Sequence, residues 1–217
     1  MKTRLIAISE PKIPECRTAE DLVAFCARVS VPNNQNNIDT ASKLLKFLAK
    51  NKHWSPFEMV SLTIEIETTR DIARQILRHR SMSFQEFSQR YAAVVDFSEP
   101  REARLQDVKN RQNSIKTTDE KLKIWWEQQQ RLILSDIEKL YTTALDLGIA
   151  KEQARAVLPE GLTTSRLYMA GTLRSWMHYC GLRMANGTQL EHQEIAKECW
   201  NIIKQEFTSL EEILNDK

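Results

Sequence analysis

The sequence predicts an α+β fold, with a small central antiparallel sheet and many helices, in a single domain spanning residues 1–217. Of the 217 residues, 41% are hydrophobic, which is enough for one large core. Only five residues are glycine, and glutamine, lysine and glutamate are frequent, which favours helix over a β-sandwich or barrel. Residues 59–68 alternate apolar and polar side chains, the pattern of a half-buried strand.

The N-terminal quarter predicts a strand, a helix, a loop and a second helix. Residues 4–8 are suited to a short strand, and Thr18 begins a capping box for a helix through Arg28. An asparagine-rich loop at 33–37 precedes Asp39, which we expect to cap a helix that ends at residue 50. The apolar face of this second helix comprises Leu44, Leu45, Phe47 and Leu48.

The alternating strand at 59–68 follows a loop at 53–58 and leads into a helix. Its inward residues are Val60, Leu62, Ile64 and Ile66, and its outward residues are Ser61, Thr63, Glu65 and Glu67. The helix should run from Arg70 to about Arg78, because a longer helix would place Arg80 on the apolar side. We therefore expect His79 and Arg80 to turn into a loop.

The second half of the chain predicts mainly helices. Residues 91–97 are a candidate strand, and the polar segment 99–117 is expected to be a mobile connection. A long helix is predicted over 118–147 with Gly148 as its C-cap, and its adjacent tryptophans, Trp125 and Trp126, are expected in the core or at a subunit interface. Further helices are predicted at 150–157, 163–180 and 188–214.

Several function classes are disfavoured by residue spacing. The glycines are not clustered as a Rossmann or Walker phosphate loop requires. The four cysteines lack C-x-x-C spacing, which predicts free thiols, and the four histidines show no metal-ligand spacing, so no metal is expected. The N-terminus does not resemble a signal peptide and no apolar run is long enough to span a membrane, so we expect a cytoplasmic protein without a membrane partner.

The segment 70–90 combines five arginines and one histidine with hydroxyl and amide side chains. Guanidinium groups suit phosphate oxygens, and the hydroxyls and amides suit a ribose and a base edge. Two other interpretations remain open: surface salt bridges to Glu65, Glu67 and Asp71, or a nucleic-acid groove in a non-catalytic nucleotide- or RNA-binding module.

Four blocks of residues, in order along the chain, make the nucleotide interpretation specific. Arg78-His79-Arg80 is followed seven residues later by Ser88, with Gln75 before the block and Arg90-Tyr91 after it. The other three blocks are His53 to Glu58 (HWSPFE), Ala154 to Pro159 (ARAVLP), and Leu182-Arg183 with Gln189 and Glu191. Together they resemble the R-H-R-x7-S signature and the accompanying segments of the flavin-dependent thymidylate synthases, the ThyX family.

This resemblance implies reductive methylation of dUMP to dTMP. It implies 5,10-methylenetetrahydrofolate as the carbon donor, FAD as the hydride carrier and NADPH as the reductant. It also implies a homotetramer of α/β subunits with active sites where subunits meet, and no nucleic-acid partner.

The resemblance further implies roles for the residues that match its motifs. FAD contacts are implied for Ser55, Arg78, His79, Arg80, Glu86, Thr172, Leu173, Arg174 and His178. Contacts with dUMP are implied for Gln75, Arg78, Glu86, Ser88, Gln89, Arg90, Arg155 and Arg183. His53 and Tyr91 are candidate folate or flavin neighbours.

Arg183 aligns with the family's arginine that polarises the pyrimidine. No cysteine lies in the arginine-rich blocks, and Cys180, three residues from Arg183, has no flanking base. We expect Cys180 and Cys199 to be buried as small hydrophobic residues. A fixed guanidinium that stabilises negative charge on the uracil ring is therefore expected to replace a thiolate nucleophile.

Overall fold

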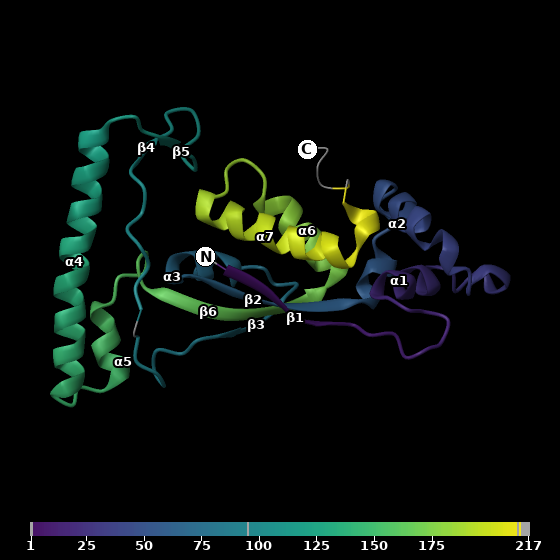
Figure 1. Cartoon of the computed structure of the whole chain (residues 1–217), viewed down its shortest axis with the longest axis horizontal. Coiled ribbons are helices and arrows are strands. Elements are labelled where there is room, and N and C mark those ends of the chain that lie inside the picture. The colour runs from purple at the N-terminus through teal and green to yellow at the C-terminus, as the bar shows by residue number, and fades with distance from the viewer. Residues whose placement is uncertain (1, 95, 212, 214–217) are drawn as a thin grey trace.

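The computed structural model describes residues 2–94, 96–211 and 213, and its centre is a four-stranded antiparallel sheet (Figure 1). The strands, in their order across the sheet, are β1 (Lys2–Ile8), β2 (Ser61–Thr69), β6 (Thr164–Thr172) and β3 (Ser83–Glu86). This confirms the predicted α+β class and its small antiparallel sheet.

The pair formed by β2 and β6 is the centre of the core. It is in register over nine residues, from Ser61 opposite Thr172 to Thr69 opposite Thr164. The predicted alternation of β2 is confirmed, because its four inward apolar residues are at most 1% exposed. Glu65, on the other face, is only 7% exposed. Its carboxylate forms an ion pair with Arg4 on β1 at 2.9 Å, and a hydrogen bond from Tyr168 lowers the pKa of this carboxyl group.

Three helices cover one face of the sheet: α3 (Arg70–Ile76), α6 (Leu173–Arg183) and α7 (Leu190–Glu206) (Figure 1). The fully buried Trp176 of α6 packs there and its indole N–H donates to the backbone oxygen of Leu62 at 3.2 Å. The path from β2 through α3 to β3 crosses over β6, which lies between the two parallel strands.

The remaining helices flank the two ends of the sheet (Figure 1). At one end lie α1 (Ala19–Ala27) and α2 (Ala41–Lys50), and beside the other stand the long α4 (Glu120–Asp146) and the short α5 (Lys151–Ala154). A hairpin of β4 (Arg104–Gln106) and β5 (Ser114–Lys116) lies between the start of α4 and α7. Short 3₁₀ turns are η1 (Pro32–Asn34), η2 (Ile38–Thr40), η3 (Ser55–Met59), η4 (Arg155–Val157) and η5 (Thr208–Leu210).

Several predicted boundaries are confirmed by their local hydrogen bonds. Thr18 and Asp21 form the expected capping box, with both side-chain-to-backbone bonds at 3.1 Å. The long helix α4 ends before Gly148, which has a φ of +83°, and the next amide N–H, of Ile149, donates back to the oxygen of Ala144. Helix α3 ends at Ile76, so His79 and Arg80 lie in the following turn as expected.

The largest correction concerns residues 163–180, which were predicted to be one helix. Residues Thr164–Thr172 are strand β6, and the helix α6 begins only at Leu173. Leu167 and Met169 are buried at period two against β2, so pairing in the sheet overrides the helical preference of leucine, methionine and alanine.

Smaller corrections follow from unexpected turns and exposure in the N-terminal part. Asp39 lies inside η2 and does not cap α2, which begins at Ala41 after Thr40. Phe47 is 55% exposed although it was assigned to the apolar face, while the 53–58 loop contains most of η3.

The predictions for the segments around the long helix also need correction. The candidate strand at 91–97 reduces, among its described residues, to an isolated bridge between Phe97 and Thr163. The segment 99–117, expected to be a connection without regular structure, contains the β4–β5 hairpin. Trp125 and Trp126 are 55% and 39% exposed, so they are not in the core of this chain.

All four cysteines are free, as predicted. Cys180 and Cys199 are completely buried, and burial raises the pKa of both thiols, so both behave as small hydrophobic groups. Over the described ranges, no helix combines the length and apolar character needed to cross a bilayer. Nor do those ranges contain three or more histidine, cysteine or acidic side chains grouped as metal ligands.

Candidate functional site

Arg183 and His79 meet where the end of α6 approaches the turn after α3. The Nε of Arg183 donates to Nε2 of His79 at 2.8 Å. Burial, together with the charges of Arg183 and His178, lowers the pKa of His79 to about 4, so its ring is neutral at physiological pH and can accept this bond. The pair fixes the guanidinium through Nε and leaves its two terminal amino groups available to a ligand.

Gln75, on α3, is held by a second set of contacts, from α7 and from the residue that precedes it. Its Nε2 donates to Oε1 of Gln189 at 2.8 Å, and its Oε1 lies 3.3 Å from Nδ1 of His192. The other ring nitrogen of His192 lies 3.1 Å from the hydroxyl of Tyr179, whose ring packs edge-on against His79. We call Gln75, His79, Tyr179, Arg183, Gln189 and His192 the helix cluster.

Three members of the helix cluster were not predicted as site residues: Tyr179, Gln189 and His192. Gln189 belongs to a matched family block, and His192 directly follows that block, so the block itself was the available signal. Tyr179 carries no signal of its own, because an aromatic residue on an apolar helix face is most often core.

The arginines of the 70–90 segment divide into two groups. Three of them form ion pairs with glutamates: Arg70 with Glu86, Arg74 with Glu160, and Arg90 with Glu152. None of these partners is one that the surface salt-bridge interpretation named, since Glu65 pairs with Arg4 and Asp71 with Arg101. Arg78 and Arg80 are exposed and form no ion pair among the described residues, so their charges are available to an anion.

A second group of predicted residues gathers where η3 meets the end of β6, and we call Ser55, Glu58, Thr172 and Arg174 the η3 cluster. The Thr172 hydroxyl donates to Glu58 at 2.6 Å, and Nε of Arg174 lies 3.7 Å from the same carboxylate. Glu58 lies in a matched block but was not predicted as a site residue.

The other residues predicted near the η3 cluster differ in exposure. His53 and His178 are exposed. The side chain of Leu173 is completely buried in the core, and its backbone N–H donates to Val60.

A third group lies at the opposite end of β6, where the loop after β3 meets α5; we call Gln89, Arg90, Glu152 and Arg155 the α5 cluster. The Nε of Arg155 donates to the backbone oxygen of Glu152 at 3.3 Å. The carboxylate of Glu152 lies 3.4 Å from the guanidinium group of Arg90. Gln89 is only 4% exposed, yet its Nε2 has no hydrogen-bond partner in the described structure. An orphaned buried donor is costly unless a ligand supplies its acceptor.

The predicted residues around the α5 cluster differ in their hydrogen bonds and in their exposure. The Ser165 hydroxyl donates to Glu86 at 2.7 Å, and Ser88 is half-buried. Tyr91 is 81% exposed, and its backbone oxygen accepts from the Lys151 ammonium at 3.2 Å.

The η3 and α5 clusters are separated by the length of the central strands. Thr172 and Thr164, at the two ends of β6, are eight residues apart, and a strand rises ~3.3 Å per residue, so the strand that separates the clusters is roughly 26 Å long. One chain therefore brings the predicted residues together in three groups and does not gather them into one pocket.

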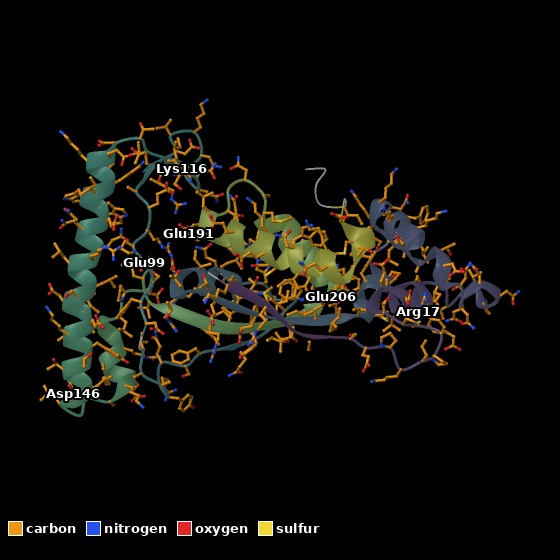
Figure 2. All side chains as sticks on the ribbon, in the orientation of Figure 1. Arg17, Glu99, Lys116, Asp146, Glu191 and Glu206 are labelled. Carbon is orange, nitrogen blue, oxygen red and sulfur yellow. The ribbon has the colours of Figure 1, made fainter. Side chains whose placement is uncertain are left out.

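An ion pair joins the β4–β5 hairpin to the start of α7, next to the helix cluster. Arg104 on β4 forms an ion pair with Glu191, and both side chains are largely buried. Figure 2 shows Glu191 at the end of α7 that lies below the hairpin carrying Lys116. A cavity of about 750 Å³ lies between the hairpin, the start of α4 and the loop before α7, and Gln189 is part of its lining.

The fold and the site define a class of protein: an α+β protein with a candidate nucleotide site built from arginine and amide side chains. A family model described as thymidylate synthase complementing protein matches residues 13–208. A probable flavin-dependent thymidylate synthase of Paramecium bursaria Chlorella virus 1 is 48% identical over 215 residues, covering 99% of both chains. The flavin-dependent thymidylate synthase of Synechocystis sp. is 49% identical over 213 residues, covering 97% of both chains.

A solved structure agrees with these relatives. The crystal structure of a UMP/dUMP methylase, PolB from Streptomyces cacaoi, bound with 5-Br dUMP, superposes with a TM-score of 0.82 at 26% identity. The match covers 99% of this chain and 94% of that one. The chain belongs to the thymidylate synthase complementing protein family, the flavin-dependent thymidylate synthases, which confirms the resemblance seen in the sequence and makes it a member of a family of methyltransferase enzymes.

Proposed function

We propose that this protein methylates dUMP to dTMP, with 5,10-methylenetetrahydrofolate as carbon donor, FAD as hydride carrier and NADPH as reductant, and that residues 1–217 form one catalytic domain acting in the cytoplasm. The observation that carries the proposal is the Arg183–His79 pair beside the unpaired Arg78 and Arg80. It supports the proposal because an oriented cation and two exposed guanidinium groups suited to anions lie on residues that match the family motifs.

Arg183 is proposed to favour the electron-rich form of the uracil ring. Its Nε is occupied by His79, so its terminal amino groups are left to face the pyrimidine oxygens. No carboxylate pairs with Arg183 in the described part of the chain, so its positive charge is not neutralised locally. A preoriented charge in a partly dry site stabilises the negative charge that develops on the ring, which raises the nucleophilicity of carbon 5.

The buried thiols support a route without a cysteine nucleophile. A thiolate is the reactive form, and burial raises the pKa of Cys180 well above its ordinary value. Cys180 is also completely buried, so it cannot reach carbon 6 of a bound nucleotide without disrupting the core.

The residues fit a flavin dinucleotide by the chemistry of their donors. Arg78 and Arg80 are exposed guanidinium groups that suit a pyrophosphate, and the η3 cluster offers hydroxyl groups and Arg174. When bound, FAD would supply the hydride, and these side chains would hold and orient it. The α5 cluster fits the nucleotide substrate, because the orphaned Gln89 amide and Arg90 and Arg155 suit its phosphate and carbonyl oxygens.

We propose that the active unit is a homotetramer whose sites combine clusters from different chains. The position of the η3 and α5 clusters at opposite ends of β6, a strand roughly 26 Å long, supports this, because the two clusters of one chain do not face each other across a common pocket. Helix α4 offers a contact surface, since Trp126, Ile133, Leu140 and Leu147 recur every seven residues and are 39–77% exposed.

The proposed function is tested with the purified full chain. The protein should show a flavin absorbance spectrum, or acquire it with added FAD, and should release the carbon-5 hydrogen of dUMP when methylenetetrahydrofolate and NADPH are supplied. A colourless protein that binds no added FAD would contradict the proposal. Salt-dependent binding of oligonucleotides without flavin would instead support a nucleic-acid-binding module.

A further inference from the structure

Tyr179, His192, Gln75 and Gln189 form a continuous chain of side-chain hydrogen bonds through the helical layer. Tyr179 and His192 are both 0% exposed, so the chain begins in the core and reaches the half-buried Gln75 and Gln189. Its three contacts measure 3.1 Å, 3.3 Å and 2.8 Å. Gln75 and Gln189 match the family motifs, whereas the two core members, Tyr179 and His192, have no role in the site as proposed so far.

The hydrogen bonds of this chain run in a single direction. Burial, with the charges of Arg183 and His79, lowers the pKa of His192 to about 3, so its ring is neutral and carries one N–H. With the Gln75 oxygen facing His192, as the structure has it, that N–H is on Nδ1, because a carbonyl oxygen only accepts. Nε2 must then accept, and the Tyr179 hydroxyl can donate to it, because burial raises the pKa of Tyr179 and keeps its proton in place.

In this arrangement the Gln75 amide has one N–H left for a ligand. Its oxygen is occupied by His192 and one of its N–H groups by Gln189. The second N–H has no partner among the described residues. With the amide in this orientation, Gln75 meets a ligand as a hydrogen-bond donor, which suits an acceptor oxygen such as a uracil carbonyl or a phosphate.

We propose that His192, supported by Tyr179, is a positioning residue that fixes Gln75 as a donor to an acceptor oxygen of the pyrimidine nucleotide. The proposal rests on the proposed function, since it assumes that Gln75 contacts dUMP. Tyr179 also packs edge-on against His79, with ring centroids 4.8 Å apart, and His79 holds Arg183. The buried Tyr179 thus supports both Gln75, through His192, and Arg183, through His79.

The test is a double-mutant cycle on dUMP binding to the flavin-loaded full chain. His192→Leu removes the Nδ1 donor, and the lost orientation of one hydrogen bond should weaken dUMP binding by about tenfold. His192→Asn keeps an N–H near the position of Nδ1 and should restore most of the affinity. In a Gln75→Leu background, His192→Leu should add almost nothing, because the two residues act through the same contact.

Two further variants separate positioning from general damage. Tyr179→Phe removes only the terminal hydroxyl and should weaken dUMP binding by about threefold with an unchanged flavin spectrum. Ile203→Val, at a fully buried position on the same helix α7 but outside the chain of bonds, should lower the melting temperature slightly and leave dUMP affinity unchanged.

The outcomes are distinguishable. If His192→Leu weakens dUMP binding equally with and without Gln75, or if His192→Asn is as impaired as His192→Leu, then His192 does not position Gln75 and the inference is wrong. A wild-type protein that binds no dUMP would overturn the proposed function, and the inference with it.

Discussion

Arg183 is oriented by a neutral histidine, and this arrangement differs from an ion pair in an important way. A carboxylate partner would cancel much of the guanidinium charge, whereas His79 accepts one hydrogen bond and leaves that charge intact. The sequence predicted both residues through the R-H-R and L-R motifs but could not predict their contact, because His79 lies in the turn after α3 and Arg183 at the end of α6, far apart along the chain. His192 was beyond prediction for a related reason: a single buried histidine is more often structural.

Replacing Arg183 by alanine should lower turnover strongly and leave the flavin bound. The expected fall in kcat is about 10²- to 10³-fold, the size seen when one preoriented donor is lost from a site that stabilises developing negative charge. Flavin absorbance and single-turnover kinetics provide the measurement. Arg74→Ala is the matched control, because Arg74 is exposed and pairs with Glu160 outside the clusters; its kcat should stay within about twofold of wild type. Unchanged turnover in Arg183→Ala would remove Arg183 from its proposed role.

The two buried histidines should make the stability of the protein depend on pH. Folding lowers the pKa of His79 to about 4 and that of His192 to about 3, from an unfolded value near 6.5. The unfolded chain therefore binds more protons below pH 6.5, and the free energy of unfolding falls as the pH falls through 6.5 toward the folded values. The loss at pH 5 should be about 2 kcal/mol for each histidine.

Urea unfolding of the ligand-free protein at pH 7.5 and pH 5 measures this loss. His192→Asn should remove roughly half of the pH-dependent fall, because one of the two buried rings is gone. His53→Gln, at an exposed position, should leave the fall unchanged. An equal free energy of unfolding at the two pH values would show that these rings are not buried in the neutral form.

Helices and strands were predicted correctly where the segment itself carried a clear sequence pattern. Strand β2 and helix α4 were predicted almost to the residue, because alternation in the first and the glycine after the second are properties of the segment itself. Strand β6 was predicted as helix because its residues suit both states, and only the nine-residue pairing with β2 decides between them. The β4–β5 hairpin was missed for a different reason: its strands are only three residues long and lie in a polar segment.

Gly148 and Gly161 allow the C-cap of α4 to be tested with a matched pair. A Cβ at either position would meet nothing within 4 Å, but only Gly148 has a positive φ, of +83°. Gly148→Ala should therefore cost about 1 to 2 kcal/mol in the free energy of unfolding, purely from the left-handed backbone. Gly161→Ala should change it by less than about 0.5 kcal/mol. Denaturant titration of both variants measures the difference, and equal values would show that the cap does not stabilise the fold.

For the protein as a whole, α4 is the helix whose apolar surface is least accounted for by packing within one chain. Only Gln130 and Tyr141 of its 27 residues are buried, while six of its large apolar residues are exposed: Ile124, Trp125, Trp126, Leu132, Ile133 and Leu140. Exposed apolar side chains that recur every seven residues are typical of a helix that packs against another helix. The expectation that Trp125 and Trp126 lie at a subunit interface stays a prediction, and the helix gives it a definite surface.

Leu140→Glu should dissociate the proposed assembly, because it places a charge in the middle of the apolar stripe of α4. Analytical ultracentrifugation should show a tetramer for the wild type and smaller species for the variant, with a folded circular-dichroism spectrum in both. Ser135→Glu, on an exposed polar position of the same helix, should remain tetrameric. A wild-type protein that sediments as a monomer would contradict the assembly, and a tetrameric Leu140→Glu variant would exclude this surface.

The separation of the η3 and α5 clusters along β6 has a consequence for mixtures of defective chains. In the proposed assembly, each site takes its η3 cluster and its α5 cluster from different subunits. Arg174→Ala and Arg155→Ala should then each be inactive alone, yet co-expressed they should regain about a quarter of wild-type activity, because random association pairs two intact clusters in one site of four. The two inactive variants would thus restore activity to each other. If each chain carried a complete site, mixing the two variants would restore none.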